Sequence, residues 1–158
     1  MTNPLFYAKI LLFGEYGIIE DSQGLTLPYS FYKGTLKFSD NQSDFEKKSN
    51  ESLQKYSDYL ANLELSKDFK IDVEAFKKDI EKGLFFDSNI PQGYGVGSSG
   101  ALVAAIFEKY SFKKYIPENI SKTQLKDLKK VFGELESYFH GKSSGIDPLI
   151  CYMNLPIL

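Results

Sequence analysis

A glycine-rich turn at residues 91–101 has the composition of a phosphate-binding loop. The turn follows an expected strand and precedes an expected helix. Glycines let the backbone come close to a ligand with its N–H groups turned inward. The start of the helix adds free N–H donors and the positive end of the helix dipole, which together favour a phosphate. Two serine hydroxyls, those of Ser98 and Ser99, can hold phosphate oxygens or a phosphate-bound metal.

Other interpretations of this turn compete. A Walker-type loop needs a Gly-Lys-Ser/Thr sequence, and the turn contains no lysine. A dinucleotide fingerprint, Gly95-x-Gly97-x-x-Gly100, is formally present. Its acidic partner would fall near Glu118, in a segment that resembles a loop and not the end of a strand. A glycine-rich turn with no ligand, which only connects a strand to a helix, stays open.

The sequence also contains a serine, a histidine and an aspartate of the kind that a hydrolase triad uses. Ser99, His140 and Asp147 are the residues concerned. The serine is not in the Gly-x-Ser-x-Gly elbow that exposes the nucleophile in such enzymes, so we discount this interpretation.

Composition excludes several classes of function. The 158 residues carry 19 basic side chains, all lysine, against 21 acidic ones, for a net charge of −2. Without arginine or a basic excess, we expect no nucleic-acid partner. The single Cys151 cannot form an internal disulfide, and the single His140 cannot join a histidine metal cluster. No targeting segment and no apolar stretch of about 18 residues is visible, so we expect a soluble, cytoplasmic protein that does not enter membranes.

Hydrophobic periodicity predicts a mixture of strands and helices, and therefore an α+β fold. Asp72 and Ser121 or Thr123 are expected to begin helices, and His140-Gly141 to end one. The apolar residues at the end of the chain have a strand-like pattern. The expected strands are 9–13, 24–32, 34–38, 84–90 and 148–158, and the expected helices run from about 43 to 63, 73–82, 101–107 and from about 121 to 140.

Three short motifs are spread over residues 8–147. Residues 91–101 resemble Pro-x-x-x-Gly-Leu-Gly-Ser-Ser-Ala, with Val96 for leucine and Gly100 for the last alanine. Residues 8–19 resemble the motif Lys-x-hydrophobic-Phe-Gly-Glu-His, and residues 136–147 resemble Glu-x-x-x-His-Gly-x-Pro-Ser-Gly-x-Asp. These are motifs of the galacto-, homoserine, mevalonate and phosphomevalonate (GHMP) kinases, and the last is similar to the mevalonate kinases.

The resemblance implies a nucleotide-binding domain like the second domain of ribosomal protein S5, with a left-handed crossover. It implies ATP and Mg²⁺ as cofactors and a small hydroxyl compound as substrate. Asp147 would take the proton of the substrate hydroxyl, and Lys9 would contact Asp147 and the terminal phosphate. The remaining implied roles are phosphate binding by Gly93, Gly95, Val96, Gly97, Ser98, Ser99 and Gly100, metal binding by Ser99 and Glu136, and substrate contacts by Glu15, His140 and Ser144.

Departures from the motifs concern the acceptor more than the phosphoryl chemistry. Tyr16 stands where mevalonate kinases usually have histidine, Ser143 where they usually have proline, and Pro148 where asparagine is common. We expect residues 1–147 to form the ATP-binding domain and residues 148–158 to begin the connection to a missing C-terminal domain. A truncated or non-catalytic nucleotide-binding paralogue and a kinase for a sugar or homoserine stay open, as does a homodimer.

Overall fold

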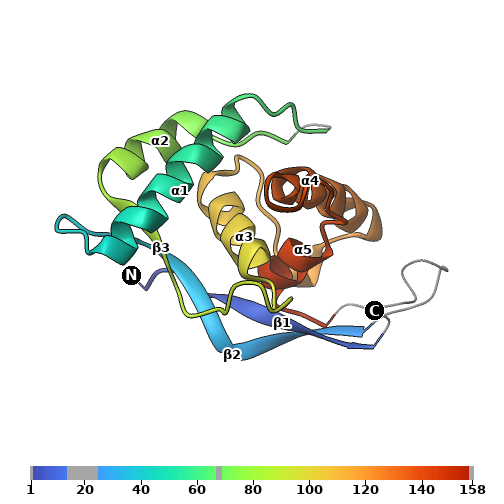
Figure 1. Cartoon of the computed structure of the whole chain (residues 1–158). Coiled ribbons are helices and arrows are strands. Elements are labelled where there is room, and N and C mark those ends of the chain that lie inside the picture. The colour runs from blue at the N-terminus through green and yellow to red at the C-terminus, as the bar shows by residue number, and fades with distance from the viewer. Residues whose placement is uncertain (1, 14–24, 67–68, 157–158) are drawn as a thin grey trace.

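The computed structural model describes residues 2–13, 25–66 and 69–156. Three antiparallel strands form one sheet in the order β1 (Phe6–Phe13), β2 (Leu25–Phe38) and β3 (Leu84–Ser88). Helices gather on one face of this sheet (Figure 1). The expected α+β class is confirmed, whereas the left-handed crossover stays a prediction.

The helices begin where side chains cap their first turns. Ser43 and Ser121 each form a capping box, with Glu46 and Gln124 respectively, and Asp72 accepts a hydrogen bond from the Ala75 amide. The expected starts at Asp72 and Ser121 are therefore confirmed. The helices are α1 (Asp44–Ala61), α2 (Val73–Glu81), α3 (Ser98–Tyr110), α4 (Lys122–His140) and α5 (Ile146–Met153), with a short 3₁₀ helix η2 (Pro117–Asn119) between α3 and α4.

The expected strand at the end of the chain is wrong, because most of that segment belongs to helix α5. Periodicity cannot tell a short apolar strand from a short buried helix. Burial against α3 and α4 decides in favour of a helix here. Since α5 begins before position 147 and ends after it, the chain has no break in secondary structure at the expected domain boundary. The division after Asp147 stays a prediction.

The two short strands expected at 24–32 and 34–38 are one continuous strand, β2. Gly34, which suggested a break, is an interior residue of this strand and is buried. A Cβ atom at Gly34 would lie 2.2 Å from the Phe86 ring. The glycine therefore makes room for an aromatic side chain of the neighbouring strand instead of ending its own strand.

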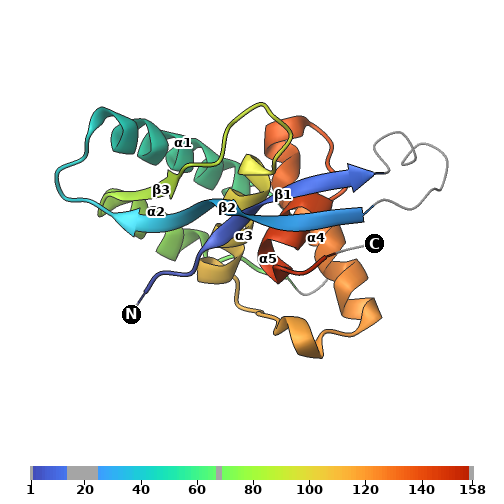
Figure 2. The same ribbon diagram turned by 90° about the horizontal axis from the view of Figure 1, so that it is seen from below.

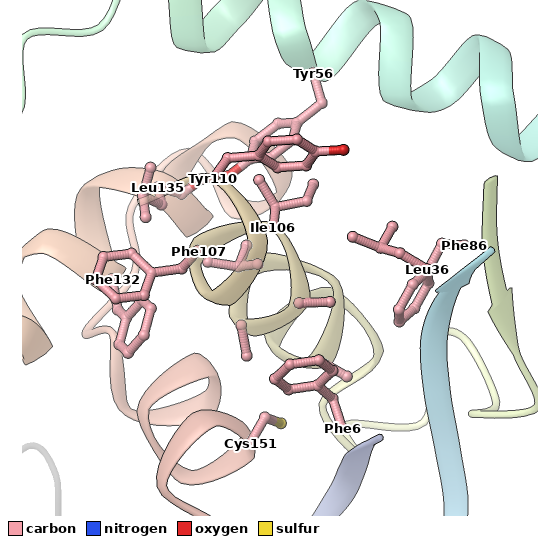
Figure 3. Packing of buried hydrophobic residues seen from close by; sticks show 14 of the residues in the cluster. Phe6, Leu36, Tyr56, Phe86, Ile106, Phe107, Tyr110, Phe132, Leu135 and Cys151 are labelled. Atoms are coloured by element: carbon pink, nitrogen blue, oxygen red, sulfur yellow. Dashed lines mark hydrogen bonds between the residues drawn. The ribbon is translucent and has the colours of Figure 1, made fainter. Parts of the chain in front are cut away.

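Helix α3 is the centre of the hydrophobic core (Figure 3). It lies between the sheet and the outer helices, and buried side chains occur all around it, as expected for a fully enclosed helix. Ile106 and Phe107 project from α3 among aromatic and aliphatic side chains of the other elements (Figure 3). Seen from the side of the sheet, β1 and β2 run in front of α3 and α5 (Figure 2). The start of α3 is thus held on a rigid scaffold.

Candidate functional site

The glycine-rich turn joins β3 to α3 through a backbone that glycine alone adopts readily. Gly93, Gly95 and Gly97 have φ angles of +79°, +68° and +85°. A Cβ atom at Gly93 or Gly95 would meet nothing within 4 Å, so the backbone conformation, and not packing, calls for glycine there. Gly97 is the N-cap of α3, and no side-chain hydrogen bond caps this helix. Its start therefore carries amide donors available to an anion.

Strand β1 fixes this turn in place. The backbone N–H of Lys9 donates to the carbonyl of Val96 over 2.9 Å. The Lys9 side chain passes so close to Gly97 that a Cβ atom there would lie 2.9 Å from Lys9 Cγ. The Cys151 thiol lies beside the same glycine, 3.9 Å from its carbonyl oxygen, and burial raises the pKa of this thiol. The turn is therefore packed between β1 and α5.

A cavity of about 840 Å³ opens in front of the turn. Residues of α1 line its opposite wall, and residues of α4 and α5 also line it. Its volume lies within the range of about 300–1,000 Å³ that is typical of small-molecule sites. The lining residues that bear on function are Phe45, Lys48, Gly93, Gly95, Val96, Gly97, Ser98, Ser99, His140 and Asp147.

Lys9 and Asp147 form an ion pair at this cavity. The Lys9 Nζ atom lies 3.0 Å from Asp147 Oδ1. The lysine side chain is 11% exposed and the aspartate side chain 34%. The lysine is therefore nearly buried, while the aspartate is accessible from the cavity. Lys9 comes from β1 and Asp147 from the first turn of α5, two elements far apart in the sequence.

Close backbone packing brings Asp147 to the start of α3. A Cβ atom on Gly100 would lie 2.8 Å from the carbonyl carbon of Asp147 and 2.9 Å from the Pro148 nitrogen. Alanine, which the family motif has at this position, would require a shift of one of the two helices. The glycine therefore permits the close approach of α3 and α5 on which the geometry of the cavity depends.

A hydrogen-bond network connects α3 to α4. The Ser99 hydroxyl donates to Glu136 Oε1 over 2.9 Å and lies 2.9 Å from His140 Nε2. The Ser143 hydroxyl donates to the other carboxylate oxygen, Glu136 Oε2. His140 Nε2 is also 4.0 Å from Glu136 Oε1. Both oxygens of this carboxylate are therefore engaged by serines from either side.

Glu136 is a buried carboxylate, with only 2% of its surface exposed. Burial raises its pKa, and the nearby Asp147 adds to this, while the hydrogen bonds from Ser143 and Ser99 and the nearby His140 act in the opposite direction. A buried carboxylate of this kind, beside a hydroxyl, is a donor set that suits a hard divalent cation. Magnesium sites of kinases commonly take one or two protein oxygens and complete the set with phosphates and water. Ser99 and Glu136 fit that arrangement.

Most of the expected site residues lie together. The cavity is lined by Gly93, Gly95, Val96, Gly97, Ser98, Ser99, His140 and Asp147, and Lys9 and Glu136 contact members of that set. Gly100 is not among the lining residues, because it packs against the backbone of Asp147, and its phosphate-binding role stays a prediction. Ser144 is exposed, accepts a hydrogen bond from the Ile146 amide over 3.4 Å and does not line the cavity. Glu15 lies outside the described residues. The roles assigned to both stay predictions.

The sequence did not point to two parts of this site. The wall formed by Phe45 and Lys48 comes from α1, which carries no recognisable motif. The hydrogen bond from Ser143 to Glu136 depends on the backbone of a turn. The only signal available for Ser143 was its departure from the family motif, which favours proline.

Two kinds of feature are absent from the residues that the structure describes. In residues 2–13, 25–66 and 69–156, no group of three or more His, Cys, Asp or Glu side chains is placed to hold a metal ion. Within the same ranges, no helix combines the length and apolar character needed to cross a bilayer.

Comparison with known proteins gives one result that agrees with this geometry. The model of the GHMP kinase N-terminal domain matches residues 56–154 of the 158. The match covers the glycine-rich turn, Glu136 and Asp147, whereas β1 with Lys9 precedes it. A search of curated proteins found no match. The kinases of this family use ATP and Mg²⁺, and membership implies ATP-dependent phosphoryl transfer. The chain belongs to the GHMP kinase family, of which it contains the N-terminal domain.

Proposed function

We propose that this chain binds Mg²⁺ and ATP in the cavity in front of α3 and phosphorylates a hydroxyl group of a small metabolite, mevalonate in the first place. The observation that carries the proposal is the ion pair between Lys9 and Asp147 at the cavity. A carboxylate in that position can accept a proton, and a lysine beside it can orient the carboxylate and attract a phosphate.

The turn and the start of α3 are proposed to hold the phosphates. The positive φ angles of Gly93, Gly95 and Gly97 and the uncapped start of α3 support this role. A single helix start favours a negative group by about 0.3–1 kcal/mol at an exposed site, so several amides must act together. Ser99 is the second residue of this helix, and its hydroxyl donates to Glu136 Oε1.

The opposite wall is proposed to hold the nucleoside. Phe45 and Lys48 lie in the first turns of α1 and line the cavity across from the glycine-rich turn. The Phe45 side chain is 55% exposed although it is aromatic and apolar. An exposed ring in a cavity offers a surface on which a purine can stack.

Ser99 and Glu136 are proposed to hold the metal ion. When bound, Mg²⁺ neutralises charge on the phosphates and lowers the barrier to phosphoryl transfer. The support is the buried carboxylate of Glu136 with a hydroxyl 2.9 Å away. His140 is hydrogen-bonded to the same hydroxyl and is proposed to face the acceptor.

Asp147 is proposed to act as the general base. As the acceptor oxygen forms its bond to the terminal phosphorus, the hydroxyl proton passes to Asp147, and the bond from that phosphorus to ADP breaks. Lys9 holds Asp147 Oδ1, which leaves the other oxygen of the carboxylate for the proton. Lys9 is therefore proposed to orient the base.

Mevalonate is proposed as the acceptor on the basis of one motif. The sequence His140-Gly141, followed by Ser144-Gly145-x-Asp147, is similar to the mevalonate-kinase segment. His140 and Asp147 both line the cavity, which supports this proposal. Ser144, on the same turn, is proposed to contact the acceptor as well.

A coupled assay of ADP release tests this function. The chain is supplied with Mg²⁺ and ATP and with mevalonate, homoserine or galactose, and a reaction without acceptor measures hydrolysis. We expect the greatest acceptor-dependent release with mevalonate. Greater release with another compound would assign another acceptor. Binding of ATP with no release for any acceptor would indicate a non-catalytic nucleotide-binding protein.

A further inference from the structure

Ser143 makes two hydrogen bonds that fix its side chain. The residue lies in the turn between α4 and α5 and is half-buried. Its hydroxyl contacts Glu136 Oε2, and the backbone N–H of Gly145 donates to the same Oγ over 3.0 Å. Proline, which the family motif has at this position, would make neither contact with its side chain.

The direction of each hydrogen bond follows from counting protons. A serine hydroxyl has one hydrogen, an amide N–H can only donate, and an ionised carboxylate can only accept. Ser143 therefore accepts from Gly145 and gives its one proton to Glu136 Oε2. Ser99 likewise donates to Glu136 Oε1, and its oxygen lies 2.9 Å from His140 Nε2. The two oxygens of Glu136 are thus in different environments.

Backbone packing sets the position of Ser143 relative to α4. Gly145 has a φ angle of +76°, and a Cβ atom there would lie 2.0 Å from the Lys129 carbonyl oxygen. A Cβ atom on Gly133 would lie 2.8 Å from the carbonyl oxygen of Ser143. The turn therefore presses directly onto the backbone of α4, one helical turn before Glu136. A small displacement of the turn would break the hydrogen bond to Glu136.

We propose that Ser143 is a positioning residue that holds Glu136 Oε2, so that Oε1 alone, on the side of Ser99, is presented to the metal ion. The inference rests on the proposed function, because it assigns Glu136 to the metal. Outer hydrogen bonds of this kind orient metal-binding side chains, and their loss commonly weakens metal binding by about 10- to 100-fold. Ser143 contacts the carboxylate and not the metal, so its effect is indirect.

The test measures binding of Mn²⁺, used as a paramagnetic probe, to the full chain saturated with ATP, through the relaxation enhancement of water protons. We expect Ser143→Ala to weaken Mn²⁺ binding by about 10- to 100-fold. Ser143→Thr keeps the hydroxyl and should restore most of the affinity. Ser137→Ala is the matched control, because the hydroxyl of this α4 serine donates to the Gly133 carbonyl of its own helix, and the variant should bind Mn²⁺ like the wild type.

A second measurement separates metal positioning from a general effect on the fold. Binding of ATP in the presence of EDTA should be the same for Ser143→Ala and the wild type. If Ser143→Ala loses ATP binding without metal, or if Ser143→Thr does not restore Mn²⁺ affinity, the role of Ser143 is structural and the inference is wrong.

Glu136→Gln distinguishes a failure of the role proposed for Ser143 from a failure of the proposed metal site. If Glu136→Gln loses Mn²⁺ while Ser143→Ala binds it like the wild type, the inference fails and the proposed function stands. If Glu136→Gln binds Mn²⁺ like the wild type, or if the wild type forms no complex with Mn²⁺ and ATP, the proposed metal site itself fails, and the inference fails with it.

Discussion

Lys9 and Asp147 show how a pair of side chains can be oriented without being fully buried. The stem of Lys9 packs against the backbone of Gly97, while its ammonium lies 3.0 Å from the aspartate. Packing of the stem restricts the rotamers of the lysine, so less conformational entropy is lost when the pair binds a ligand. The pair therefore presents a preformed arrangement of base and cation.

Replacing Asp147 tests its proposed role as the general base. We expect Asp147→Asn to lower kcat by about 10²- to 10⁴-fold, because asparagine cannot accept the hydroxyl proton. Affinity for ATP should be nearly unchanged, since the glycine-rich turn is the part proposed to hold the phosphates. Steady-state kinetics and calorimetric titration with ATP measure the two effects.

The control for this variant is Asp87→Asn. Asp87 pairs with Lys37 on the sheet, and both side chains are largely exposed, so kcat should not change. Turnover of Asp147→Asn at the wild-type rate would remove Asp147 as the base.

At the scale of elements, the packing of α3 on α5 decides where the site residues lie. Gly100 in the first turn of α3 faces the backbone of Asp147 and Pro148 in α5. The Ser99 hydroxyl, on the neighbouring residue, is then within reach of α4. Gly100 thus links the position of the glycine-rich turn to that of Asp147, the proposed base.

We expect Gly100→Ala to destabilise the protein, although alanine in a helix is normally more stable than glycine by about 0.5–1 kcal/mol. A Cβ atom 2.8 Å from the Asp147 backbone overpacks this interface, which costs about 1–3 kcal/mol. The shift of Asp147 should also lower kcat at least about tenfold. Urea denaturation and steady-state kinetics measure these effects.

Ser121→Ala provides the comparison. It removes the cap of α4 at a distance from the cavity and should cost about 1 kcal/mol of stability without changing kcat. An increase in stability for Gly100→Ala, or equal loss of kcat in both variants, would contradict the role given to the α3–α5 contact.

Local signals were sufficient for most of the elements. The caps at Ser43, Asp72 and Ser121 mark the starts of helices because a capping side chain acts within one turn of the chain. Helix α5 was not predicted, because its apolar residues become helical through burial against other helices. Gly34 suggested a break between two strands for a similar reason. The Phe86 ring, which requires a glycine at this position, belongs to another strand.

The candidate site was predictable where residues belong to a motif. The geometry brings Lys9, Ser99, Glu136 and Asp147 together as those motifs imply. The α1 wall and the hydrogen bond from Ser143 were not predictable, because each depends on packing between segments without a local pattern. The structure thus adds residues that enclose and support the candidate site to those that the motifs name.

At the scale of the whole molecule, segments from both ends of the chain meet at one place. Strand β1 opens the described chain and α5 closes it, yet both contact the turn before α3 (Figure 1). The family match begins at residue 56, after β1, but the backbone bond from Lys9 to Val96 makes that strand part of the same site. The proposed function thus requires that the amides of one turn bind the phosphates of ATP beside Asp147.

Nuclear magnetic resonance of the backbone amides of the whole 18.0 kDa chain tests this claim most directly. On titration with ATP and Mg²⁺, the amide signals of Gly93, Gly95, Gly97, Ser98 and Ser99 should shift and saturate together, accompanied by that of Asp147. An absence of shifts at the turn, or shifts confined to residues away from the cavity, would contradict the account.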